Sequence, residues 1–190
     1  MKTKLLTICL LLFSSQVFAD DVNTNIKKLN FFNGCESCNL KGADLVHAFL
    51  RGTNLTNANL SYANLSYANL KDVNLTGANL TGANLMNLLL KDVNLSYANL
   101  TGANLSRVNL KDVNLMNVNL MNANLKDVNL TNADLSGADL RYADLSGANL
   151  TAADLSGADL KDSILLNANM STAILCNTNT PWGIDNTGCK

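Results

Sequence analysis

The sequence has very little of several residue types on which large cores and catalytic sites depend. Its 190 residues include one proline, one tryptophan and one histidine, and aromatic residues make up only 5% of the chain. Charged residues account for 15%, and 14 lysines and arginines stand against 15 acidic residues. These scarcities exclude an aromatic-rich core, a proline-rich linker protein and a highly charged disordered tail. The near-neutral charge makes neither nucleic acid nor an acidic polymer an expected partner.

Candidate catalytic and metal-binding residues are scarce as well. His47 is the only histidine and Glu36 is the only glutamate. The sequence therefore gives little support to Ser-His-Asp catalysis, to a histidine metal site or to a pair of acid-base carboxylates. No nucleotide-binding pattern such as GxGxxG or a P-loop appears. We expect a non-enzymatic protein without a metal or a cofactor.

The segment 1–19 has the pattern of a secretory signal peptide. Two lysines precede an apolar run over residues 5–13, and Val17 and Ala19 occupy the −3 and −1 positions of a cleavage site after Ala19. The run is too short to cross a bilayer comfortably, and no later stretch could cross one. Acylation of Cys9 is disfavoured because this cysteine lies inside the apolar run. We expect export to the periplasm or beyond, and a mature chain with 12 basic and 15 acidic residues.

An apolar residue falls on every fifth position from Leu40 to Leu175, which makes 28 consecutive pentads. Two residues before it lies a small residue, Ala in 18 pentads and Val in six, and Asn or Asp stands between the two in 24. A spacing of five cannot form one face of a helix, and in a straight strand it would alternate between faces. Each pentad is instead predicted to be a three-residue extended piece with Leu and the small residue inward, followed by a two-residue corner.

A second repeat indicates how many pentads close one coil. KDVNL occurs at 71–75, 91–95 and 111–115, and these three copies begin four pentads apart. Four pentads per turn predict an all-β fold, a square, right-handed parallel β-solenoid over residues 38–177. About seven coils at a spacing of about 4.8 Å would make a rod about 34 Å long.

The repeat units resemble those of a known family. ANLTGANL at 78–85 and ADLSGADL at 133–140 are similar to the A(D/N)LXX units of the pentapeptide repeat family. This resemblance implies a right-handed quadrilateral β-helix. It implies little about activity, because many members have none known, while the best understood resemble DNA and bind type II topoisomerases.

Both ends of a solenoid expose core side chains and unpaired backbone, so both need caps. We predict an N-terminal cap over residues 20–37 and a C-terminal cap over residues 178–190. The apolar residues expected in the first cap are Ile26, Leu29, Phe31 and Phe32. The second is expected to be a short hairpin that contains Trp182 and Ile184.

Four cysteines remain after signal cleavage, namely Cys35, Cys38, Cys176 and Cys189. The two ends of the predicted solenoid lie too far apart for a disulfide, which needs Cα atoms within about 7 Å. The possible pairs are therefore Cys35 with Cys38 and Cys176 with Cys189, which we expect to be structural staples in an exported protein. A redox-active Cys35-x-x-Cys38 is the alternative, although no helix N-terminus or βαβ context accompanies it.

A column of basic residues recurs once in every four pentads at one predicted corner. Its members are Arg51, Lys71, Lys91 and Lys111. The neighbouring column holds Asp72, Asp92 and Asp112. We interpret this face as charge-compensated, and a groove for an anion or a charged polymer is the alternative.

Apolar residues interrupt the outward polar positions on one edge. Val46 with Phe49, and Met86 with Leu89, occupy equivalent positions two coils apart. Such a patch is a candidate site for a protein partner or for self-association, and the alternative is that these residues shield an irregularity near the bulky Leu88.

The sequence therefore favours an exported, non-enzymatic β-solenoid that acts as a structural or protein-binding scaffold through a lateral face. The alternative that the family resemblance suggests, a DNA mimic that binds a topoisomerase, needs a cytosolic protein with a strongly acidic surface. The signal peptide, the cysteines and the weak net charge all weigh against it. Ice binding is disfavoured because Met116 interrupts the ladder of Thr56, Thr76 and Ser96.

Overall fold

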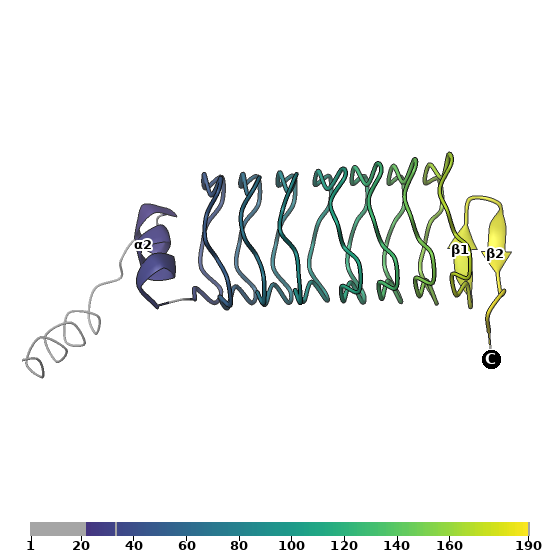
Figure 1. Cartoon of the computed structure of the whole chain (residues 1–190), viewed down its shortest axis with the longest axis horizontal. Helices are drawn as coiled ribbons and strands as arrows, with labels where there is room; N and C mark the ends of the chain where they lie inside the picture. The colour runs from purple at the N-terminus through teal and green to yellow at the C-terminus, as the bar shows by residue number, and fades with distance from the viewer. Residues whose placement is uncertain (1–21, 33, 190) are drawn as a thin grey trace, which may run out of the picture.

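The computed structural model describes residues 22–32 and 34–189 as a straight stack of coils with a different element at each end (Figure 1). Helix α2 (Val22–Phe32) lies at the N-terminal end. Strands β1 (Thr178–Thr180) and β2 (Gly183–Asp185) form an antiparallel pair at the C-terminal end. The predicted signal peptide, residues 1–19, lies outside the described residues.

Neighbouring coils pair in parallel through the middle residue of each pentad. Asn59 bridges both Asn39 and Asn79, and the same step of four pentads recurs on all four sides of the stack. Four pentads therefore close one coil, as the KDVNL repeat predicts. Each extended piece is so short that the pairing consists of isolated bridges, and within the described residues only β1 and β2 are continuous strands.

The corners explain why Asn or Asp precedes the central leucine. The Ala43 N–H donates to the Leu40 carbonyl at 3.0 Å across the corner, and Gly42 has a φ of 66°, as a type II turn requires. The side-chain oxygen Oδ1 of Asn39 accepts the N–H of Lys41 at 3.1 Å. The outward Asn thus satisfies a corner N–H group that no neighbouring coil reaches.

The interior is a column of leucines flanked by Ala and Val. Leu100, in the middle of the stack, is 0% exposed, and most other central leucines are buried to the same degree. Burial of each such side chain contributes about 1.5–3 kcal/mol. The inward assignment of the repeat therefore agrees with the structure.

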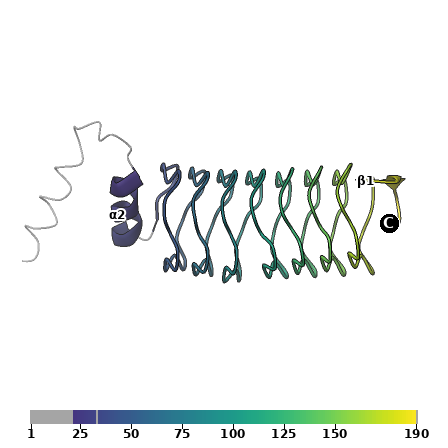
Figure 2. The same cartoon turned by 90° about the horizontal axis from the view of Figure 1, so that it is seen from above.

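The stack is irregular at Leu88, which stands in a row otherwise made of Ala and Val. Asn69 bridges Leu89, but within the described residues Leu89 and Asn109 form no bridge. Figure 2 shows a wider step between neighbouring coils in the teal part of the stack. Leu90, unlike the fully buried Leu110 of the next coil, is only partly buried. A side chain larger than Ala in a close-packed row separates the coils locally.

Replacing Leu88 with Ala is expected to stabilise the protein by about 1–2 kcal/mol, although most Leu→Ala changes in a core are destabilising. The smaller side chain lets the coils close, and each restored backbone hydrogen bond contributes about 0.5–1.5 kcal/mol. Several such bonds together outweigh the loss of about 2–3 kcal/mol from buried apolar area. Thermal melting followed by circular dichroism measures the difference.

The matched control is Leu85→Ala, a buried central leucine of the same coil. We expect this variant to lose about 2–5 kcal/mol. A melting temperature that falls equally in both variants would show that Leu88 does not hold the coils apart.

Helix α2 covers the N-terminal end of the leucine column. Leu29 is buried and Ile26 is partly buried against the core, as expected for the cap. The Asn25 side chain donates from Nδ2 to the Asn39 carbonyl at 2.9 Å and so joins the helix to the first coil. The side chains of Phe31 and Phe32 lie outside the described part of the structure.

The C-terminal hairpin is present, but its large apolar residues do not cover the core. Trp182 is 64% exposed and Ile184 is 74% exposed, so the expectation that they cap the leucine column is wrong. Thr178 and Thr180 of β1 are buried in their place. The Thr178 hydroxyl donates to the Leu155 carbonyl at 2.7 Å, which satisfies a polar group that the end of the core encloses.

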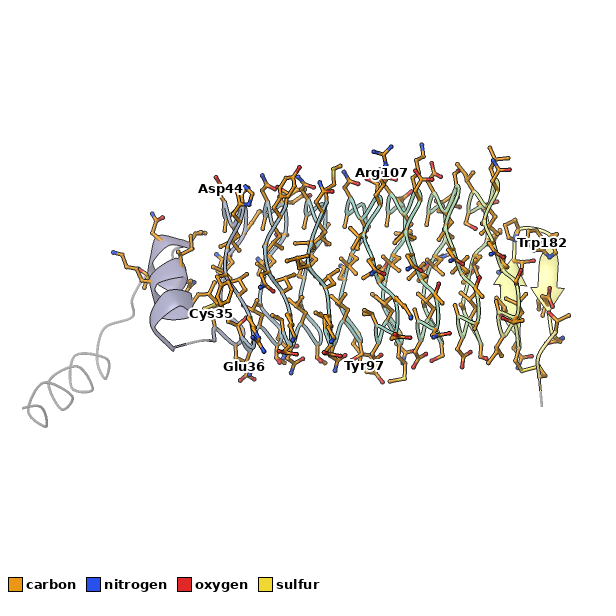
Figure 3. All side chains as sticks on the ribbon, viewed as in Figure 1. Cys35, Glu36, Asp44, Tyr97, Arg107 and Trp182 are labelled. Atoms are coloured by element: carbon orange, nitrogen blue, oxygen red, sulfur yellow. A yellow bond between two sulfur atoms is a disulfide. The ribbon has the colours of Figure 1, made fainter. Side chains whose placement is uncertain are left out.

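A disulfide lies at each end of the stack. Cys35 and Cys38 are joined with their Cα atoms 5.4 Å apart, and Cys176 and Cys189 are joined with a Cα separation of 4.7 Å. The first lies in the first coil, beside α2, where Figure 3 labels Cys35. The second ties the segment after β2 to the last coil.

Candidate partner-binding face

The exposed apolar residues Phe49 and Leu89 lie in one row on one side of the stack. Phe49 is 77% exposed and Leu89 is 63% exposed. Asn69 lies between them and bridges both, so the two side chains belong to alternate coils of the same face. Both replace the Asn of a regular pentad, and they therefore add apolar surface at positions that present Asn or Asp in most pentads.

Val46 and Met86 are only partly buried and lie at the adjoining corner of the same coils. The sequence places Ser66 between them. The four residues thus form an interrupted apolar strip, which we call the lateral patch. The polar residues Asn69 and Ser66 lie between its members and divide the lateral patch into two parts.

An aromatic pair beside the lateral patch was not predicted from the sequence. The rings of His47 and Tyr67 stack with centroids 5.1 Å apart and an interplanar angle of 26°. Both residues are exposed at the corner that also carries Val46. Their separation by four pentads places them in one column of adjacent coils, and that separation is the signal that could have revealed the pair.

The basic column is only partly compensated by its acidic neighbours. Arg51 Nε lies 3.2 Å from Asp72 Oδ2, and Lys111 Nζ lies 3.9 Å from Asp112 Oδ2. Among residues 34–189, Lys71 and Lys91 make no ion pair. The two middle members of the column therefore keep an unpaired positive charge beside Leu89.

Most acidic residues of the C-terminal half pair with basic side chains or accept a backbone N–H. Arg141 donates two hydrogen bonds to Asp139, of which the shorter is 2.6 Å. These bonds hold the pKa of Asp139 below its usual value. Lys126 Nζ lies 3.0 Å from Asp144 Oδ2. In the part of the chain that the structure describes, no three His, Cys, Asp or Glu side chains gather to bind a metal.

Among residues 34–189, His47 and Glu36 do not meet other groups in a catalytic arrangement. His47 faces Tyr67 and solvent, and Glu36 lies on the outside of the first coil (Figure 3). None of the helices among the described residues has the length and apolar character of a membrane span.

Comparison with known proteins shows a match to one family model, described as pentapeptide repeats. The match consists of eight copies in overlapping segments that together run from residue 35 to residue 179. No curated protein matches this chain.

Several solved structures are similar to the stack. The pentapeptide repeat protein HetL of Nostoc sp. strain PCC 7120, involved in heterocyst differentiation regulation, is 26% identical, with a TM-score of 0.49 over 79% of this chain and 90% of that chain. QnrB1, a plasmid-mediated fluoroquinolone resistance protein, is 21% identical, with a TM-score of 0.51 over 72% of this chain and 79% of that chain. A pentapeptide repeat protein from the Arabidopsis thaliana thylakoid lumen is 34% identical, with a TM-score of 0.29 over 45% of this chain and 63% of that chain. The likeness to QnrB1 supports a right-handed quadrilateral β-helix and shows the fold alone.

Proposed function

The chain belongs to the pentapeptide repeat family, and on that premise we propose that it is an exported, non-enzymatic scaffold of about seven coils that binds another protein. The proposed contact is the lateral patch together with the His47–Tyr67 pair. The observation that carries the proposal is the exposure of Phe49 and Leu89 at positions where a regular pentad has Asn. Large apolar side chains at exposed positions mark sites of protein contact when they gather on one face.

The surroundings of the lateral patch suit a modest protein interface. Aromatic residues supply most of the energy of such interfaces, and Phe49 and Tyr67 are both exposed there. The coils that carry the lateral patch hydrogen-bond to one another on this side, through Asn69 N–H to the Ala48 carbonyl and Leu89 N–H to the Ala68 carbonyl, so little ordering accompanies binding. The partner is expected to be a protein with a shallow apolar groove.

Two features support the proposal of export. The N-terminal pattern is that of a signal peptide with cleavage after Ala19. Disulfides at both ends of the stack are typical of periplasmic and extracellular proteins rather than cytosolic ones.

The alternative of a DNA mimic has no specific support in the surface charges. A mimic of duplex DNA needs regular rows of unpaired acidic groups. Here the chain carries 14 basic and 15 acidic residues, and Asp139 and Asp144 are paired with Arg141 and Lys126. The likeness to QnrB1 concerns the fold alone and gives this alternative no specific support.

The double variant Phe49→Ser, Leu89→Asn is expected to weaken binding of the partner about tenfold or more, without loss of thermal stability. Both side chains are exposed, and Asn at 89 would supply the side-chain acceptor that this corner lacks. Cell fractionation followed by crosslinking in the exported fraction identifies the neighbours, and pull-down with the purified variant measures the change.

The control is Tyr97→Ser, Tyr142→Ser, which removes exposed aromatic surface away from the lateral patch. This control should retain the partner. Unchanged capture and unchanged sedimentation of the patch variant would contradict the proposal, and loss of a dimer instead of a heterologous complex would identify a second copy of the chain as the partner.

A further inference from the structure

The corner at residues 90–93 differs from three other corners of the same sequence. LKDVNL occurs at 70–75, 90–95, 110–115 and 125–130. At residues 70–73 all four N–H groups have acceptors, of which two belong to the following coil, one is the Asn69 side chain and one is the Leu70 carbonyl. Residues 110–113 and 125–128 are bonded in the same way. Within residues 34–189, none of the four N–H groups of residues 90–93 has an acceptor.

Two residues just before this corner explain the difference. Leu88 separates its coil from the next, which removes the acceptors on that coil. Leu89 replaces the Asn whose Oδ1 would accept the N–H of Lys91, as Asn69 does for Lys71 at 3.1 Å. Because the four LKDVNL copies are identical, the free N–H groups result from Leu88 and Leu89 and not from the corner residues themselves.

The conformation of the corner suits an anion. Asp92 has a φ of 57°, so the chain turns there in the manner that makes successive backbone N–H groups into an anion-binding concavity. A cleft of about 320 Å³ adjoins the corner. We call it the Leu88 cleft, and its apolar wall consists of Leu88, Leu89 and Leu90.

The other residues that line the Leu88 cleft carry ammonium or amide groups. Lys71 and Lys91 line it together with Asn69 and Asn109. Neither lysine makes an ion pair among the described residues, so both charges are available to a ligand. The lysines and the free N–H groups would bind an anionic group of a ligand, and the leucines would contact an apolar part of the same ligand.

We propose that the Leu88 cleft binds a monocarboxylate carried on an apolar chain. The carboxylate would accept hydrogen bonds from the N–H groups of residues 90–93 and from Lys91, and the hydrocarbon would lie against the leucines. A single negative charge is favoured, because Asp92 lines the adjoining cleft of about 240 Å³ and would repel a polyanion, whereas Asp112 in the same cleft is paired with Lys111. The proposal does not depend on a protein partner at the lateral patch.

Two ligand sources share this chemistry, a free fatty acid and the C-terminus of an apolar peptide. The probes are therefore decanoate with decanol as its uncharged counterpart, and N-acetyl-Leu-Leu with its C-terminal amide. Each is titrated into the ¹⁵N-labelled protein, and amide shifts together with calorimetry report the site and the affinity. We expect an acid to shift the amides of residues 88–93 and 109, with its uncharged counterpart at least about tenfold weaker. Binding by one acid alone identifies the source.

Variants locate the site. Leu88→Ala, which lets the coils close, and Lys91→Gln are each expected to weaken binding of the acid by about tenfold. Lys161→Gln, near the other end of the stack, and Phe49→Ser, in the lateral patch, should leave it unchanged. The proposal is overturned if no probe causes a shift, if decanol binds as well as decanoate, or if both Leu88→Ala and Lys91→Gln bind as the parent does.

Discussion

Leu100→Asp is expected to unfold the middle of the solenoid. Leu100 is fully buried, and its N–H donates to the Asn119 carbonyl of the next coil at 2.7 Å. An unpaired carboxylate at this position costs several kcal/mol of desolvation, and the lost leucine burial removes about 2–3 kcal/mol more. The sum is comparable to the total stability of an ordinary domain, about 5–15 kcal/mol. Loss of the β signal in circular dichroism near room temperature is the expected observation.

The control variant Asn99→Asp places the same carboxylate at the adjacent outward position, so it separates the effect of burial on stability from the effect of the added charge. The same row holds Asp139 and Asp159, which bridge each other in the regular stack, so the outward position accepts a carboxylate. We expect Asn99→Asp to melt within a few degrees of the parent. If Leu100→Asp retained its β signal and its melting temperature, the inward assignment of the leucine column would be refuted.

The sequence determines the repeat geometry because two periods constrain it together. The period of five specifies which residues point inward, and the spacing of the KDVNL copies specifies that four pentads close a coil. The bridge from Asn39 to Asn59 follows from both. The role of the outward Asn as an acceptor for the corner N–H could have been inferred from Asx-turn chemistry, but periodicity alone only places this residue outside.

The departures from regularity depend on neighbours that lie one coil away in the stack. The sequence shows that Leu88 is large for its row, but the loss of pairing to Asn109 results from packing against a coil that the pattern places only approximately. The stacking of His47 on Tyr67 likewise depends on two corner residues with positive φ, at 57° and 60°. Trp182 lies in the C-terminal hairpin as expected, but its side chain is exposed, and Thr178 and Thr180 of β1 are buried at the end of the core instead.

Reduction of Cys176–Cys189, or the variant Cys176→Ser, Cys189→Ser, is expected to destabilise the C-terminal end by about 3 kcal/mol. The two cysteines are 13 positions apart, and closing a loop of that length removes about this much chain entropy from the unfolded state. The segment that the disulfide retains is held otherwise by few bonds, among them Leu175 N–H to the Thr187 carbonyl at 2.8 Å. Without the disulfide, the hairpin and the last coil should separate from the stack.

The loss should be local because each coil contacts only its neighbours, so the stability of a solenoid is a sum of short-range contributions. Hydrogen exchange is the measurement, with faster exchange expected at residues 155–180 and unchanged protection in the middle of the stack. Cys35→Ser, Cys38→Ser is the matched control, because these residues are 3 positions apart and so close a shorter loop, worth about 2 kcal/mol, at the opposite end. Equal acceleration along the whole stack would mean that the coils unfold as one cooperative unit, and unchanged exchange at residues 155–180 would mean that β1 and β2 hold the end without the disulfide.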